Sequence, residues 1–162
     1  MTEPRWLNAD ERRAWLAVLS ITTLLPATLD TQLQNARKLS LFDYNVLAML
    51  SEAPGQYLPM SELAARTSAS LSRLSHVVTK LQTRGWVERQ PHPSDARVTT
   101  AHLTEEGFAT LVELAPGHVA TVRGLLLDGL DADDVSDLAR IGDKIVAALD
   151  ADHWILRDPS SA

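Results

Sequence analysis

SELAARTSASLSRLSHVVTKLQTRGWVERQPHPSDARVTTAHLTEEG, residues 61–107, is the most informative stretch of this chain. It begins with a short helical pattern, continues through a polar step at residues 67–70, and enters an amphipathic helix that stops at Gly85. Two β-like runs follow, at residues 86–90 and 97–103. The loop between these runs carries residues typical of a turn or an ion pair: Pro91, Pro93, Asp95 and Arg97. Helix, turn, helix and two-stranded wing form an architecture that reads duplex DNA, with the second helix in the major groove.

The second helix of this stretch has two chemically different faces. Its apolar residues recur at the i, i+3, i+4, i+7 spacing of a packed side: Leu71, Leu74, Val77, Val78 and Leu81. The opposite face carries short polar side chains and cations: Ser72, Arg73, Ser75, His76, Thr79, Lys80 and Thr83. Ser68 or Ser70 can cap the helix N-terminus, which directs the positive end of the helix dipole at DNA.

The polar face of this helix suits a DNA groove. Short side chains allow close approach to base edges, while Arg73, His76 and Lys80 can reach bases or phosphates. We therefore assign DNA contacts to the helix start and its polar face: Ser70, Ser72, Arg73, Ser75, His76, Thr79 and Lys80. A merely solvated helix face has the same composition, and the pattern of this helix alone does not separate the two interpretations.

Asp95 and Arg97 in the wing favour the DNA-binding interpretation. Residues i and i+2 of an extended segment point to the same side, so the carboxylate can hold the guanidinium in one pose. An extended arginine at a hairpin tip suits a narrow minor groove, where the negative potential is enhanced. The alternative is a surface ion pair of little energetic consequence.

The same stretch resembles the winged-helix segment of the MarR family of bacterial transcription regulators. The resemblance rests on several motifs in a fixed order: SELA at 61–64, the run 74–81, RGWVER at 84–89, DAR at 95–97 and LTEEG at 103–107. Each motif alone is weak, and their combination in this order is specific. Two positions depart from the family pattern, since many members carry arginine at the positions of Ala96 and His76. Both departures bear on which DNA sequence is read.

The resemblance implies two partners besides DNA. In the family, the first helix and the last two helices of two subunits interdigitate, so we expect a homodimer that reads a pseudo-palindromic operator. Family members often bind small phenolic or lipophilic ligands in a crevice between the dimer helices and the reading head. Trp15, Tyr44 and His118 are candidate wall residues for such a ligand site, although core packing is the simpler explanation of these side chains.

Helical patterns flank the winged-helix stretch on its N-terminal side. Residues 9–39 carry apolar residues at helical spacing, and Pro26 should kink or break that helix. Residues 42–50 predict a second helix with Tyr44, Leu47 and Leu50 turned inward. Residues 57–59 are a possible third strand of the wing sheet.

On the C-terminal side, Thr104 should cap a long helix that bends at Pro116. Asp131 or Asp133 should start a final helix. That helix carries an apolar stripe along one side: Val135, Leu138, Ile141, Ile145 and Leu149. The terminal helices therefore have more apolar surface than one small winged helix needs, which favours a dimer over an extended monomeric core.

Composition excludes several other classes of protein. The chain has 162 residues, of which 45% are hydrophobic, enough for a globular core, and it has no cysteine for a disulfide framework. Its five histidines are scattered and no nucleotide-binding or nucleophile motif occurs, so we expect no enzyme, no catalytic residue, no metal site and no cofactor. No apolar run approaches a membrane span and no signal-peptide core begins the chain, so we expect a cytoplasmic protein without a membrane partner.

Charge is distributed unevenly along the chain. The formal net charge is −6, but residues 66–97 hold six basic and two acidic side chains, a net of +4, which leaves −10 for the remainder. A basic reading head on an acidic body suits DNA binding, because local phosphate contacts supply the electrostatic attraction.

Together these patterns predict a mainly α fold with a small β-wing, a winged helix-turn-helix with flanking dimerisation helices. We divide the chain into an N-terminal dimerisation helix (1–40), a DNA-binding lobe (41–103), C-terminal dimerisation helices (104–152) and a loose tail (153–162). The expected function is a homodimeric, sequence-specific DNA-binding transcription regulator, a repressor released by a small ligand. The alternative is a winged-helix module that binds proteins and no operator.

Overall fold

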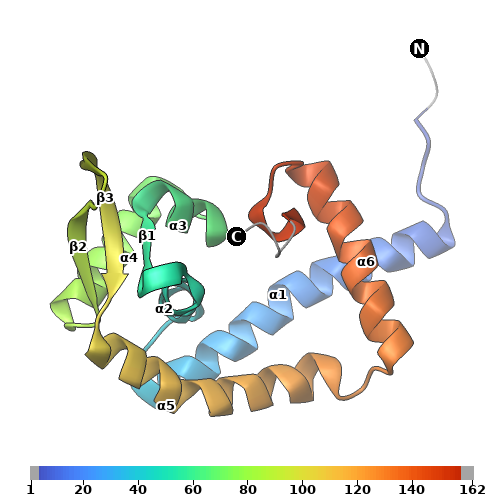
Figure 1. Cartoon of the computed structure of the whole chain (residues 1–162). Coiled ribbons are helices and arrows are strands. Elements are labelled where there is room, and N and C mark those ends of the chain that lie inside the picture. The colour runs from blue at the N-terminus through green and yellow to red at the C-terminus, as the bar shows by residue number, and fades with distance from the viewer. Residues whose placement is uncertain (1–3, 158–162) are drawn as a thin grey trace.

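The computed structural model describes residues 4–157 and has the predicted mainly α architecture with a small wing (Figure 1). Its principal elements are α1 (Ala9–Arg37), α2 (Leu41–Glu52), β1 (Tyr57–Pro59), α3 (Met60–Arg66), α4 (Leu71–Thr83), β2 (Val87–His92), β3 (Asp95–Leu103), α5 (Glu105–Val122) and α6 (Ala132–Leu149). Three short helical turns lie between or after them: η1 (Pro54–Gln56), η2 (Arg123–Leu127) and η3 (Trp154–Leu156). Helices α2, α3 and α4 gather with the sheet in one lobe, while α1, α5 and α6 form a frame of long helices beside it (Figure 1).

The lobe has one apolar core shared by its helices and its sheet. The sheet is antiparallel in the order β1-β3-β2, which confirms the predicted third strand at 57–59. Tyr44, Leu47 and Leu50 of α2 are buried, as their spacing predicted. Helix α4 buries four of its five predicted inward residues, but Leu71 is 54% exposed because it is the first residue of the helix.

Side-chain caps define where the helices begin. Ser70 caps α4, whereas Ser68 adopts a left-handed conformation (φ 50°) in the turn before it. Thr104 caps α5 as predicted, and Asp131 rather than Asp133 caps α6 through a capping box. Each cap satisfies a backbone N–H that the first helical turn leaves without a partner.

The wing strands are longer than the sequence predicted. Strand β2 includes Pro91, and β3 begins at Asp95, so the connecting turn contains only residues 93 and 94. The prediction that Pro91 and Asp95 lie in a loop was therefore wrong, whereas Arg97 lies in a strand as the predicted run 97–103 required. Pro91 is tolerated because β2 is an edge strand, and the register shifts between Pro91 and His92.

Helix α1 runs without a break through Pro26, so the expected interruption does not occur. Only Leu29 and Leu33, near its C-terminal end, are buried. The helix is long and apolar enough, by length and composition, to cross a membrane, which corrects the expectation that no apolar run approaches such a span. Most of its apolar surface is exposed within the single chain.

Helices α5 and α6 complete the frame. Helix α5 continues through Pro116 to Val122 and leads into a turn of π-helix at η2. No residue of α6 is buried within the chain. Its predicted stripe is exposed over its whole length: Val135 40%, Leu138 43%, Ile141 46%, Ile145 44% and Leu149 82%.

The segment after α6 was predicted to be loose, and for residues 153–157 that was wrong. Residues Trp154–Leu156 form the helical turn η3, which lies against α3. Trp154 and Leu156 are partly buried there, and this burial gives the segment a defined position. The remainder of the predicted tail, residues 158–162, lies outside the described part of the chain.

Candidate nucleic-acid interface

Helix α4 presents an exposed polar face opposite its buried stripe. The residues predicted to contact DNA are exposed at Ser70, Ser72, Arg73, His76 and Thr79, and half-buried at Ser75 and Lys80. The Ser70 hydroxyl accepts a hydrogen bond from the backbone N–H of Arg73 at 3.2 Å, which fixes the first turn of the helix. The helix therefore offers its positive end and a row of short polar side chains on one accessible face.

Two cations of this face are held by α2. The Arg73 guanidinium carbon lies 4.2 Å from the centre of the Phe42 ring, within cation–π distance. Lys80 Nζ donates to Asp43 Oδ2 at 2.5 Å, and the Asp43 carboxylate is only 1% exposed. Lys80 therefore compensates a buried charge in addition to lying on the polar face of α4. From the sequence, Lys80 was predicted only to reach bases or phosphates, and Asp43 was not singled out within its predicted helix.

Arg89 on β2 is a further basic residue, for which the sequence patterns predicted no role. Its guanidinium donates to the Ser75 carbonyl oxygen at 2.8 Å, to Thr79 Oγ1 at 3.1 Å and to Gln82 Oε1 at 2.9 Å. It thus joins the wing to the middle of α4 and places a positive charge beside the polar face. Its position in the WVERQ strand, alternating with the buried Val87, is the signal that could have found it.

The wing carries the predicted ion pair between Asp95 and Arg97. Asp95 Oδ1 accepts from Arg97 Nε at 3.0 Å and Oδ2 accepts from Arg97 Nη2 at 3.0 Å, a bidentate contact, while the Arg97 backbone N–H also donates to Oδ1 at 3.1 Å. These hydrogen bonds lower the pKa of the Asp95 carboxyl and raise that of Arg97. The Arg97 side chain is 90% exposed, so its guanidinium group is held in one orientation by Asp95 and is still accessible from solvent.

Arg84 has a structural role at the base of the lobe. Its guanidinium donates to the backbone carbonyl oxygens of Arg37 at 3.4 Å and Lys38 at 3.1 Å, at the C-terminal end of α1. It also lies 4.9 Å from the centre of the Trp86 ring. A cation at a helix C-terminus is favourable because the last carbonyl groups lack partners. Arg84 therefore joins the reading lobe, which consists of α2, α3, α4 and the sheet, to α1.

The three candidate ligand residues do not gather in one place. The Tyr44 and His118 rings lie 4.2 Å apart between centres, and His118 Nδ1 is 3.2 Å from Gln32 Oε1 of α1. Burial lowers the pKa of His118. Burial is also the main cause that raises the pKa of Tyr44, and the negative charge of Glu52 raises it further. Trp15 is 52% exposed and precedes Gln32 by 17 residues, about 25 Å along the helix. Within one chain, the candidate site therefore reduces to Tyr44, His118 and Gln32.

This geometry is that of a winged helix-turn-helix protein of the kind that binds DNA to regulate transcription. A family model described as "MarR family" matches residues 39–98. The chain is 39% identical to Sco3205, a MarR family transcriptional regulator from Streptomyces coelicolor whose crystal structure is in complex with DNA; the TM-score is 0.87 over 93% of this chain and 94% of that one. It is 38% identical to AbsC, a MarR family regulator from the same organism, with a TM-score of 0.85 over 90% of this chain and 98% of AbsC. The chain belongs to the MarR family of transcription regulators.

A curated relative has a weaker similarity over a shorter stretch. The transcriptional repressor YetL of Bacillus subtilis is 28% identical over 107 residues, which are 66% of this chain and 64% of YetL. The match thus covers less than two thirds of the length of that relative.

Family membership confirms the expectation of a non-enzymatic regulator. Within residues 4–157, no group of three or more histidine and carboxylate side chains is arranged to hold a metal ion.

Proposed function

We propose that this protein is a homodimeric repressor that binds a pseudo-palindromic operator through α4 and the wing. The observation that carries the proposal is the accessible polar face of α4 beside an oriented wing arginine, in a chain 39% identical to a regulator crystallised with DNA. In this assignment, residues 41–103 read DNA, with base contacts from α4 and a minor-groove contact from Arg97. YetL, the curated relative, is a repressor by name, which supports repression over activation.

The proposed dimer is supported by apolar surface that the single chain leaves exposed. Helix α1 exposes Trp15, Leu16, Val18, Leu19, Ile21 and Leu24, and α6 exposes the stripe that begins at Val135. These helices lie in the 1–40 and 104–152 segments that we assign to dimerisation, and both belong to the frame of long helices beside the lobe (Figure 1). Burial against a second copy would remove this surface from water, and it explains the membrane-like composition of α1 without a membrane. A protein that acts on the chromosome in this way is cytoplasmic in a bacterial cell.

The proposed effector is a small phenolic or lipophilic molecule that displaces the repressor from its operator. Tyr44 and His118 are its proposed contacts, because they bring a phenol and an imidazole together where α2, α5 and α1 meet. Trp15 belongs to the proposal only as part of the α1 surface that a dimer would cover.

Salt dependence of duplex binding tests the proposed function. For a winged helix that neutralises several phosphates, the logarithm of the binding constant should fall linearly with the logarithm of the salt concentration, with a slope of about −0.9 per phosphate contact. We would select binding duplexes from a random pool, then measure dissociation constants by fluorescence anisotropy from low to moderate salt. A full-length protein that selects no duplex, or that binds without salt dependence, would contradict the proposal and favour the protein-binding module.

A further inference from the structure

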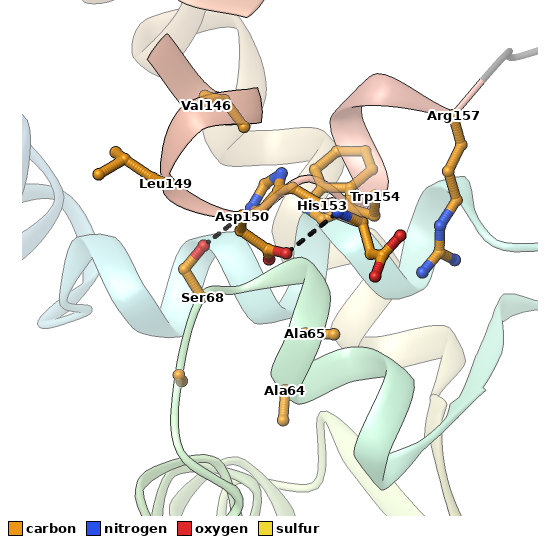
Figure 2. A pocket seen from close by; sticks show the side chains of 11 residues that line it. Ala64, Ala65, Ser68, Val146, Leu149, Asp150, His153, Trp154 and Arg157 are labelled. Atoms are coloured by element: carbon orange, nitrogen blue, oxygen red, sulfur yellow. Dashed lines mark hydrogen bonds between the residues drawn. The ribbon is translucent and has the colours of Figure 1, made fainter.

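The segment after α6 folds back onto the reading lobe (Figure 2). Asp150 ends α6, and the chain then turns so that His153 Nε2 lies 3.3 Å from Ser68 Oγ. Ser68 is the left-handed residue of the turn that leads into α4. One end of this segment therefore touches the point from which the recognition helix starts.

A second contact joins the same segment to α3. Arg157 donates to Glu62 Oε1 at 3.3 Å, and Arg66 donates to the same oxygen at 3.0 Å. The Arg66 guanidinium carbon also lies 5.9 Å from the centre of the Trp154 ring. Trp154 thus lies over α3 within a small network of charges, of which Glu62 and Arg66 belong to the first helix of the helix-turn-helix and Arg157 to the segment after α6.

The contact is made around a hollow and not through a close-packed core. A hollow of about 530 Å³ lies beside this contact, with Ala64, Ala65 and Ala69 on one side and Val146 and Leu149 of α6 on the other (Figure 2). Small side chains on the α3 side leave this space open. Of the residues that line the hollow, Ala64 alone belongs to the buried core of the lobe, so loss of this contact would leave most of that core covered.

Trp154 contributes its ring and not its N–H group. Its Nε1 is buried and has no hydrogen-bond partner among the described residues. A buried donor without a partner opposes docking, so the stacking and packing of the indole ring must account for the position of this residue. An aromatic ring without the N–H group, as in phenylalanine, should therefore hold this segment against α3 equally well.

We propose that residues 150–157 form a strap that positions the reading lobe on the dimerisation helices, with Trp154 as its anchoring residue. The strap starts at α6, which carries the proposed dimer stripe, and ends on α3 and the turn before α4. In a dimer, the orientation of each lobe sets the distance between the two recognition helices and therefore the half-site spacing that is read. A lobe already held in that orientation loses less freedom on binding. This role rests on the proposed function as a dimeric operator-binding protein.

Trp154→Ala tests the strap, with Ile155→Ala as the matched control and Trp154→Phe as the conservative variant. Ile155 is the next residue of η3 and is 52% exposed, so its truncation should leave docking unchanged. All proteins are full length, and each is used to select from a pool of duplexes in which the two half-sites found for the native chain are separated by variable spacers. We expect Trp154→Ala to lose about tenfold in affinity at the preferred spacing and to discriminate less among spacings, while both other variants resemble the native protein.

A measurement without DNA separates the strap from the proposed function. Hydrogen exchange of the α3 amides in the free protein should be faster in Trp154→Ala than in Ile155→Ala, at equal thermal stability of the lobe. If the native chain selects a spacing and Trp154→Ala keeps both that preference and the native exchange rates, the strap has no positioning role. If Trp154→Ala only unfolds the protein, Trp154→Phe must still keep the native preference, and its failure would overturn the ring-anchored role. A native chain that selects no duplex removes the function and this role together, whereas the exchange result still reports whether the strap docks.

Discussion

At the scale of single residues, the wing depends on the bidentate pair between Asp95 and Arg97. We expect Arg97→Ala to weaken operator binding by about 1–3 kcal/mol, the usual loss for one good groove contact. Arg123→Ala is the control, because Arg123 is also exposed and paired, with Asp128, but lies outside the reading lobe. Fluorescence anisotropy at fixed salt measures both variants, and an unchanged dissociation constant for Arg97→Ala would remove the minor-groove role.

The same pair predicts a pH dependence. Hydrogen bonds from Arg97 hold the pKa of the Asp95 carboxyl below its ordinary value. Because the folded pKa is depressed, the pair is fully formed above the unfolded pKa of about 3.9 and is lost only as pH falls through the lower folded value. Carboxyl NMR titration should give Asp95 a midpoint below 3.9 in the native chain and an ordinary one in Arg97→Ala. Equal midpoints in the two proteins would mean that the pair does not form in solution.

Lys80 has a role in stability that its place on the polar face of α4 conceals. Lys80→Ala leaves the Asp43 carboxylate, 1% exposed, without its cation, so we expect a loss of about 1–3 kcal/mol in the free energy of unfolding. Thr83→Ala, one turn further along α4, is the control, since its hydroxyl bonds only the Thr79 carbonyl. Urea unfolding measures both. A Lys80→Ala protein as stable as the native chain would show that Asp43 does not need this partner.

At the scale of elements, the start of α5 is fixed against the corner between α4 and β2. A Cβ on Gly107 would overlap the Trp86 carbonyl group and lie 2.9 Å from Leu103 Cδ1, so Gly107→Ala should destabilise the lobe by about 1–3 kcal/mol. Gly117→Ala in the same helix is the control, because the nearest atom to its new Cβ is Gln32 Nε2 at 4.0 Å. That variant should be neutral or gain up to about 1 kcal/mol from helix propensity. Thermal unfolding distinguishes them, and equal effects of the two substitutions would contradict the packing described for Gly107.

At the scale of the whole molecule, the apolar stripe of α6 predicts the state of assembly. A chain that ends before Asp131 lacks this stripe, whose burial stabilises a dimer at about 25 cal/mol per Å² of apolar surface. We expect the shortened chain to be monomeric or insoluble and to lose tight operator binding, because one lobe alone has the contacts of a single half-site. Sedimentation of the full-length chain at micromolar concentration is the direct check. A monomer mass for that chain would exclude the dimer and, with it, the palindromic operator.

Local sequence patterns predicted much of this fold. The cap of α5 at Thr104, the inward face of α2 and the strand at 57–59 were all predicted, and Ser70 is one of the two serines predicted to cap α4, because each feature depends on residues a few positions apart. The errors have a common cause. Pro26 was expected to kink or break α1 and Pro91 to lie in a loop, but α1 continues through Pro26 and Pro91 lies in an edge strand, where tertiary context accommodates it.

The sequence by itself determined the class of fold, the position of the recognition helix and the wing pair of Asp95 with Arg97, since helical periodicity, caps and an i, i+2 contact are local properties. Only the tertiary structure decided that Lys80 meets Asp43, that Arg89 joins the wing to α4 and that Trp154 lies over α3. Those contacts join residues from 10 to 88 positions apart, and no spacing rule covers such distances along a chain. Their partners are set by how the helices pack, which depends on the shape of the whole core.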